Sequence, residues 1–182
     1  MIRKFFYWID RLCNSVMLRF RKEVFLSKIG SKEFSVQVLG KIYINASNIR
    51  IGKNVTIYPN VYFWGDGLIE IGDNVDIGVG TIIFSKNKIK IGNNTSIAGQ
   101  CYIIDSNHST EKMTLINQQP LDIAENGILI GSDVWIAAGC KIVKGALIND
   151  GCVVGALSLV NSEIPIDGIA VGIPAKTIKF RI

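Results

Sequence analysis

The sequence predicts an all-β fold, a parallel β-helix of six-residue repeats with a short N-terminal amphipathic helix. Three observations predict it: a unit that recurs every 20 residues, an aliphatic residue at every sixth position, and one polar stretch that interrupts both. The recurring unit begins at Ile51-Gly-Lys-Asn, Ile71-Gly-Asp-Asn and Ile91-Gly-Asn-Asn. One such unit cannot bury its own apolar face, so successive units must stack around a continuous core.

Residues 1–30 are expected to form the amphipathic helix and its connector. Apolar residues recur there at helical spacing and form one stripe. The members of this apolar stripe are Ile2, Phe5, Phe6, Ile9, Leu12, Cys13, Val16, Met17 and Phe20. Residues 1–22 also hold six Lys or Arg and one Asp, which accounts for the whole net charge of +5. Charges interrupt the segment too often for it to span a bilayer.

Two interpretations of this helix stay open. It packs across the end of the coil as a cap, or it rests on a membrane surface or mediates contact between copies of the chain. The basic residues lack the repeat and the interleaving of a nucleic-acid-binding surface, so we expect no nucleic-acid partner.

Residues 31–104 are expected to form the first β-helix array. Each recurring unit holds three six-residue repeats, and the third opens with Phe63, Ile83 or Ile103. Three repeats fall short of the 20-residue spacing, which leaves about two extra residues in each coil. We expect them in turns at residues 65–67 and 86–88.

Residues 105–127 are polar, break the six-residue register and are expected to form an extruded loop. A compact coil rarely ejects a segment of this length unless the segment has a function. This loop is therefore the expected place of an active site.

Residues 128–162 are expected to form the second β-helix array, and residues 163–182 a C-terminal tail. Aliphatic residues now recur at uninterrupted intervals of six, at Ile130, Ile136, Ile142, Ile148, Val154 and Val160. The positions four residues later hold small or β-branched residues, as tight corners require: Val134, Ala138 or Cys140, Ala146, Cys152 and Ser158.

Three of the four cysteines, Cys101, Cys140 and Cys152, occupy inward positions of the repeat, where a thiol behaves as a small apolar group. Free buried thiols fit a reducing cytoplasm. No CxxC pair or Cys/His cluster occurs, so the sequence predicts no metal site.

His108 is the only histidine and stands at the mouth of the loop, next to Asn107 and three residues after Asp105. A neutral imidazole there would take a proton from a hydroxyl near neutral pH. Its other ring nitrogen would be held by the Asp105 carboxylate or by a backbone carbonyl.

The segments Ile130-Gly-Ser-Asp-Val-Trp-Ile136, Val154-Gly-Ala-Leu-Ser-Leu-Val160 and Ala170-Val-Gly-Ile-Pro-Ala-Lys resemble the hexapeptide-repeat acyltransferases. The likeness covers roughly residues 38–181 and is strongest to sugar O-acetyltransferases of the galactoside and maltose type and to those of bacterial surface polysaccharides. It implies a left-handed β-helix with an extruded active-site loop. It also implies homotrimers with active sites between neighbouring subunits.

The resemblance also implies roles for single residues. His108 would be the general base, and Asp105 and Asn107 would orient it or the acceptor. Acetyl-coenzyme A would be bound at the positions Trp135, Ala138, Gly155, Ala156, Ser162, Lys176, Lys179 and Arg181, of which the last three would face its phosphates. This chain has Asn161-Ser162 where relatives often have Thr-Lys, and Ala138 where the galactoside enzymes have serine.

These implications predict transfer of an acetyl group from acetyl-coenzyme A to a hydroxyl of a sugar. The acceptor would be a sugar or a lipid-linked or nucleotide-linked glycan of bacterial surface polysaccharide, such as O-antigen, capsule or exopolysaccharide. The expected location is the cytoplasm, including the inner face of its membrane. Two alternatives stay open: acyl transfer to an amino sugar or another small acceptor, and a β-helix that binds without catalysis.

Overall fold

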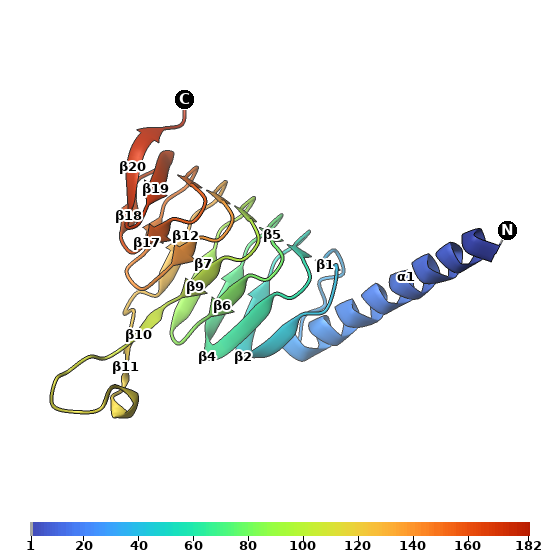
Figure 1. The fold of residues 1–182 in the computed structure, drawn as a ribbon, viewed down its shortest axis with the longest axis horizontal. Helices are drawn as coiled ribbons and strands as arrows, with labels where there is room; N and C mark the ends of the chain where they lie inside the picture. Colours follow the sequence, from blue (N-terminus) through green and yellow to red (C-terminus); the bar gives the residue numbers. More distant parts are fainter. Residues whose placement is uncertain (1) are drawn as a thin grey trace.

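The computed structural model describes residues 2–182, apart from the side chains of Ile2 and Phe5. It is a left-handed parallel β-helix of short strands from which one long helix and one hairpin project (Figure 1). The predicted fold class is confirmed. The helix is α1 (Ile2–Ile29), and the hairpin consists of β10 (Ser106–His108) and β11 (Leu121–Ile123), with a 3-10 turn at Ile116–Gln118 between them.

The coil has three faces, and each face is a parallel sheet whose strands stack along the coil axis. The first face contains β1 (Gln37–Val38), β3 (Thr56–Ile57), β5 (Asp76–Ile77), β8 (Ser96–Ile97), β13 (Trp135–Ile136), β16 (Val153–Val154) and β19 (Gly168–Gly172). Each of these strands except the longer last one is two residues long, because a six-residue repeat leaves the remaining positions for a corner.

The second and third faces share the long strands β2 (Tyr43–Ile51) and β4 (Tyr62–Ile71), which run around the corner between them. The second face continues with β6 (Ile82–Phe84), β9 (Tyr102–Ile104), β14 (Lys141–Ile142) and β17 (Leu159–Val160). The third continues with β7 (Lys88–Ile91), β12 (Ile128–Ile130), β15 (Leu147–Ile148) and β18 (Glu163–Ile164).

One column of side chains fills the coil from end to end. Phe63, Ile83 and Ile103 occupy successive coils and are buried, as the six-residue period predicts. The small positions that follow the later aliphatic residues are buried too, and among them Cys140, rather than Ala138, occupies the inward site after Ile136. Because the coils register so closely, each apolar side chain packs against its equivalents in the coils above and below.

The extra residues of the 20-residue coils lie at the corner between the second and third faces, which we call the hairpin corner. At residues 65–67 the long strand β4 continues through the corner, with a register shift against β2. At residues 85–87 the chain makes an open turn between β6 and β7. Gly65 has a φ of 102°, and a Cβ there would collide with the Ser85 carbonyl oxygen, so this position requires glycine.

The expected C-terminal tail, residues 163–182, forms strands. These residues contain β18, β19 and finally β20 (Ala175–Phe180), which pairs antiparallel with β19. This last strand covers the open edge of the first face, where unpaired backbone groups would otherwise remain.

Of the two interpretations of α1, the cap applies only to the last turns of the helix, which contact β1 and β2 of the first coil. Only these turns dock: Phe25 and Leu26 are buried, and the Phe25 ring stacks on Phe63 with centroids 6.1 Å apart. The rest of α1 projects away from the coil (Figure 1). Within residues 2–182, no helix is long and apolar enough to cross a membrane.

We predict that Ile83→Ala lowers the free energy of unfolding by about 2–5 kcal/mol, because it leaves a cavity in a fully buried column. Urea unfolding followed by circular dichroism measures the change. Ile166→Ala is the matched control: Ile166 is 62% exposed, so its loss should cost less than about 0.5 kcal/mol. Equal effects of the two substitutions would contradict a core built on the six-residue period.

Candidate active site

His108 lies on the hairpin that leaves the coil at the hairpin corner. In the ladder between β10 and β11 it stands opposite Leu121, and its neighbour Asn107 stands opposite Asp122. Both His108 and Asn107 are exposed. The His108 side chain borders an open hollow of about 670 Å³ together with residues 110–112 and 114–117 of the loop. The imidazole is therefore accessible to a small molecule.

Asp105 is fully buried at the base of the hairpin. Its Oδ1 accepts a hydrogen bond from the Lys86 amide at 2.7 Å, and its Oδ2 accepts from the Asn87 amide and the Ser85 hydroxyl at 2.9 Å. A buried carboxylate needs such donors because it has lost its water. These bonds occupy the carboxylate, so Asp105 fixes where the hairpin begins. This differs from the direct orientation of His108 that the sequence suggests.

The return arm of the hairpin is held by the same turn of the coil. The Asn87 side-chain amide donates to the carbonyl oxygens of Ala124 at 2.9 Å and Glu125 at 2.8 Å. The Ala124 amide in turn donates to the Asp105 carbonyl oxygen at 2.7 Å. Sequence reasoning missed Asn87 as a supporting residue, although the extra residues at 86–88 were a signal, since a plain coil does not need them.

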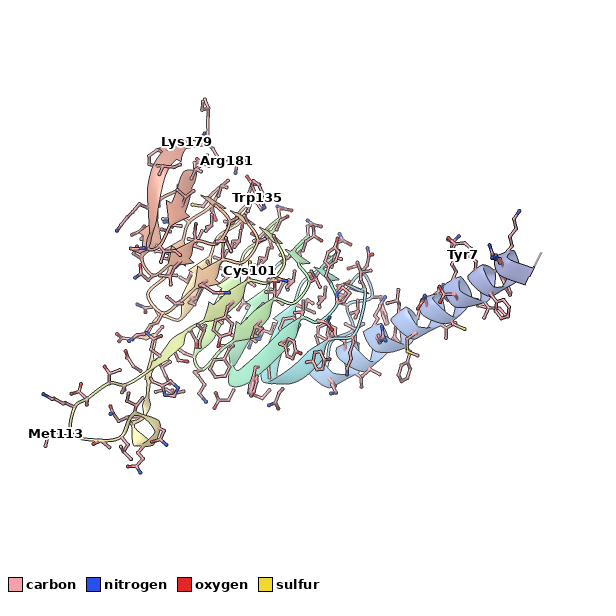
Figure 2. All side chains as sticks on the ribbon, in the orientation of Figure 1. Tyr7, Cys101, Met113, Trp135, Lys179 and Arg181 are labelled. Atoms are coloured by element: carbon pink, nitrogen blue, oxygen red, sulfur yellow. The ribbon has the colours of Figure 1, made fainter. Side chains whose placement is uncertain are left out.

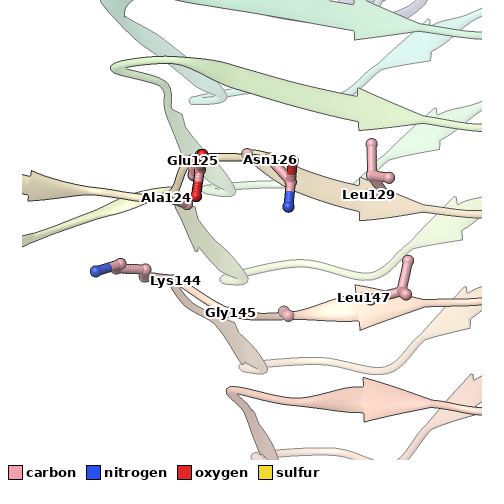
Figure 3. A pocket seen from close by; sticks show the side chains of 9 residues that line it. Ala124, Glu125, Asn126, Leu129, Lys144, Gly145 and Leu147 are labelled. Carbon is pink, nitrogen blue, oxygen red and sulfur yellow. The ribbon is translucent and has the colours of Figure 1, made fainter.

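The next coil supports the hairpin from the other side. Lys144 forms an ion pair with Asp122 on β11. Between the return arm and this coil lies a hollow of about 380 Å³, lined by Ala124, Asn126 and Leu147 among others (Figure 3). His108 is thus carried by a segment that two neighbouring coils clamp.

The outer part of the loop has internal order. The Gln119 side chain accepts a hydrogen bond from the Glu111 amide at 2.9 Å and donates to the carbonyl oxygens of Glu111 at 2.8 Å and Thr114 at 2.7 Å. These bonds close the loop across its width. Met113 lies at the far end of the loop and is 94% exposed (Figure 2).

Trp135 lies outward on the first face, well away from the hairpin (Figure 2). Its indole is exposed between two shallow hollows. One, of about 430 Å³, is bordered by Ser96, Val153 and Arg181. The other, of about 350 Å³, is bordered by Tyr58 and further residues of the first face. An aromatic ring flanked by open space offers a surface on which a flat or extended ligand can pack.

Arg181 borders one of these hollows, but its guanidinium is engaged with the protein. It forms an ion pair with Asp133 at 2.8 Å and donates to the Gly151 carbonyl oxygen at 2.8 Å. The hydrogen bond to the Asp133 carboxylate raises the pKa of the Arg181 guanidinium. Lys176 and Lys179 on β20 are exposed, and among the described residues neither has a carboxylate within ion-pair distance.

Small residues line the corner between the first and second faces. Ala138 and Ala156 are exposed there in successive coils, and the Leu157 amide donates to the Ala138 carbonyl oxygen at 2.9 Å. The Gly155 amide is used by the ladder, where it donates to Ala170. Ser162 lies elsewhere, on the hairpin corner, where its carbonyl oxygen accepts from the Leu147 amide at 3.5 Å.

The site residues expected from the sequence therefore fall into two groups on one chain. His108, Asn107 and Ser162 belong to the hairpin corner, whereas the other cofactor positions lie on the first face or at its corner with the second face. Among residues 2–182, no three His, Cys, Asp or Glu side chains are arranged to hold a metal ion.

The sequence is similar to that of proteins assigned as acetyltransferases. A Mycobacterium tuberculosis protein assigned this way is 40% identical over 86 residues, which are 47% of this chain and 28% of that protein. WbbJ of Escherichia coli, assigned to lipopolysaccharide biosynthesis as an O-acetyl transferase, is 35% identical over 89 residues, 46% of this chain and 45% of that one. The aligned parts are therefore less than half of either relative. No protein-family profile matches the chain.

Solved structures share the fold. A maltose O-acetyltransferase from Clostridium difficile is 27% identical, with a TM-score of 0.64 over 98% of this chain and 85% of that one. A mutant of AntD, an N-acyltransferase from Bacillus cereus, was solved with dTDP-4-amino-4,6-dideoxyglucose and coenzyme A and has a TM-score of 0.75 at 24% identity, covering 88% of this chain and 89% of that one. The chain thus shares the left-handed coil of these two solved acyltransferases.

We predict that Asp105→Ala loosens the hairpin, because it leaves the part-buried amides of Lys86 and Asn87 without their acceptor, at a cost of at most about 1–3 kcal/mol for each. Hydrogen exchange of residues 121–127 should become faster. The nuclear magnetic resonance signal of His108 should shift, and it is easy to follow because the chain has one histidine.

Asp66→Ala is the matched control for this prediction. Asp66 pairs with the Lys86 ammonium at 2.8 Å, but its carboxylate is 69% exposed, so its loss should leave the hairpin unchanged. Unchanged exchange in Asp105→Ala would contradict the clamp.

Proposed function

We propose that the protein is an acetyltransferase that moves the acetyl group of acetyl-coenzyme A to a hydroxyl of a sugar. The observation that carries this proposal is His108, the single imidazole of the chain, exposed on a hairpin that two coils clamp to a sugar-acyltransferase fold. A rigid support matters because a general base must meet its hydroxyl within hydrogen-bond distance.

The proposed reaction is a direct transfer. His108 takes the proton of the acceptor hydroxyl, and the oxygen attacks the acetyl carbonyl carbon. A C–O bond forms, the C–S bond of the thioester breaks, and the imidazolium returns its proton to the departing sulfur. Backbone amides near Ala138 and Ala156 would stabilise the oxyanion of the tetrahedral intermediate.

Acetyl-coenzyme A would lie along the first face. Trp135 would pack against its pantetheine arm, and Lys176 and Lys179, both exposed, would meet its phosphates. Arg181 would contribute less charge than the sequence suggests, because Asp133 already neutralises part of it. Ser162 would contact the cofactor from the hairpin corner of a neighbouring chain.

We propose a homotrimer with one active site between each pair of subunits. The separation of Trp135, on the first face, from the hairpin that carries His108 supports this (Figure 2). A second copy that brings its first face to the hairpin corner would complete the site. A contact between two different patches of identical chains can close into a ring, and a trimer is such a ring.

The proposed acceptor belongs to bacterial surface polysaccharide, as a sugar or as a lipid-linked or nucleotide-linked glycan. The similarity to WbbJ supports this class. We place the reaction in the cytoplasm, and at the inner membrane face where the glycan is lipid-linked. Asn107, exposed beside His108, would contact this acceptor.

A second candidate is acyl transfer to the nitrogen of an amino sugar. It is favoured by the similarity in fold to AntD, which was solved with an amino sugar nucleotide and coenzyme A. A β-helix without catalytic activity is less compatible with the clamped hairpin, because a regular binding surface needs no interruption of the coil.

We predict that His108→Ala lowers sugar-dependent release of coenzyme A by roughly 100-fold or more, the scale of a lost general base. The assay follows free thiol across a panel of sugars, amino sugars and nucleotide sugars. Glu125→Ala is the control, since Glu125 is exposed on the same hairpin and has no proposed role. Full activity of His108→Ala with its best acceptor would overturn the mechanism.

We predict that subunits with His108→Ala and subunits with Trp135→Ala recover activity when they are unfolded and refolded together. Mixed trimers contain interfaces that pair an intact His108 with an intact Trp135 from another chain. The measurement is coenzyme A release at low acetyl-coenzyme A concentration, compared with each variant refolded alone. A mixture no more active than the sum of its parents would place both residues in one subunit's site.

A further inference from the structure

Helix α1 has two apolar faces, and the coil uses one of them. Val16 precedes Phe25 by nine residues, and Phe20 precedes Ile29 by the same number. At 3.6 residues per turn, nine residues are two and a half turns, so the members of each pair lie on opposite sides of the helix. Phe25 is buried against the coil and Ile29 is half-buried. Val16 therefore faces away from the coil, whereas Phe20, at the end of this stripe nearest the coil, also borders a hollow with Ile42.

This outward stripe is strongly exposed. Leu12 is 50% exposed, Val16 60%, Met17 46% and Phe20 64%. The helix that carries these four side chains projects from the coil (Figure 1). Clustered exposed apolar side chains of this kind mark a surface that binds a membrane or another protein.

The positive charge of α1 indicates what kind of partner its apolar stripe binds. Arg3, Lys4, Arg11 and Arg19 are exposed on the same helix, and residues 1–22 have six basic side chains against Asp10. A second copy would bring the same positive charge against this one and be repelled, whereas an anionic surface would be attracted. A basic helix with an apolar stripe is suited to lie in the plane of a membrane surface.

We propose that α1 binds the surface of an anionic lipid bilayer through the stripe Leu12, Val16, Met17 and Phe20. The helix lies flat with its apolar stripe among the acyl chains and its basic side chains at the headgroups. Its length of about 42 Å carries Leu12 and Val16 beyond the coil, and Phe25 and Leu26 hold the coil to the membrane-bound helix.

An anionic membrane as the partner of α1 extends the proposed function. The membrane proposal rests on that function in one respect only, namely that the acceptor is lipid-linked. Membrane binding would hold the hairpin near such an acceptor. Lipid binding and acetyl transfer are measured in separate assays, so a failure of one is distinguishable from a failure of the other.

The test is co-sedimentation of the full chain with vesicles of phosphatidylcholine alone or mixed equally with phosphatidylglycerol. We expect binding to the anionic vesicles, weakened by high salt, and little binding to the neutral ones. Val16→Asp combined with Phe20→Asp should weaken binding at least roughly tenfold. Arg11→Gln combined with Arg19→Gln should weaken it about fivefold for each charge removed.

Ile166→Asp is the matched control, because Ile166 on the coil is about as exposed as Val16 and should not affect binding. Thermal unfolding and the mass in solution establish that each variant keeps its fold and oligomeric state. The proposal is overturned if the wild-type chain does not sediment with anionic vesicles, or if the Asp variants bind them as well as it does. It is also overturned if, in the absence of lipid, the Asp variants form smaller oligomers than the wild-type chain, since the stripe would then contact a second copy.

Discussion

Stacking of one coil on the next is the interaction on which the whole structure depends. The amides of each coil donate along the coil axis to the carbonyl oxygens of the following one, as from Thr56 to Val75 and from Trp135 to Cys152, both at 2.9 Å. The same stacking buries the aliphatic column. An insertion within a face would break bonds to the coils on both sides, so extra chain is tolerated only at corners and ends. Hairpin and helix lie at such places.

The hairpin shows how a corner insertion becomes rigid. An exposed loop would ordinarily be mobile, but the turn at 85–87 binds both of its ends, and Lys144 binds it from the next coil. The interruption of the coil is thus supported by residues far away in sequence. The proposed catalysis needs a rigid hairpin, because the base and the cofactor surface belong to different parts of the coil. In the proposed trimer they can be aligned across subunits only if each is held firmly on its own chain.

Much of the fold could be predicted, because the pattern that specifies it is local and repeated. Ile83 and Ile103 could be assigned to the core from their period alone. Contacts between segments without a repeat could not be predicted. Asp105 lies three residues from His108 in sequence, yet its carboxylate binds Lys86 and Asn87, and the pairing of Arg181 with Asp133 likewise joins distant segments. The direction of α1 depended on which of its two apolar faces docks, and helical period cannot decide between them.

The number of coils between α1 and the hairpin sets the distance between them. Strand β2 contacts the docked end of the helix, and the hairpin follows β9, three strands further along the second face. Neighbouring strands are about 4.8 Å apart, so the hairpin stands about 14 Å along the axis from that end. Adding or deleting one whole coil would change this height by a single strand spacing and leave both ends intact. The distance between anchor and hairpin can therefore change in discrete steps, independently of what either end binds.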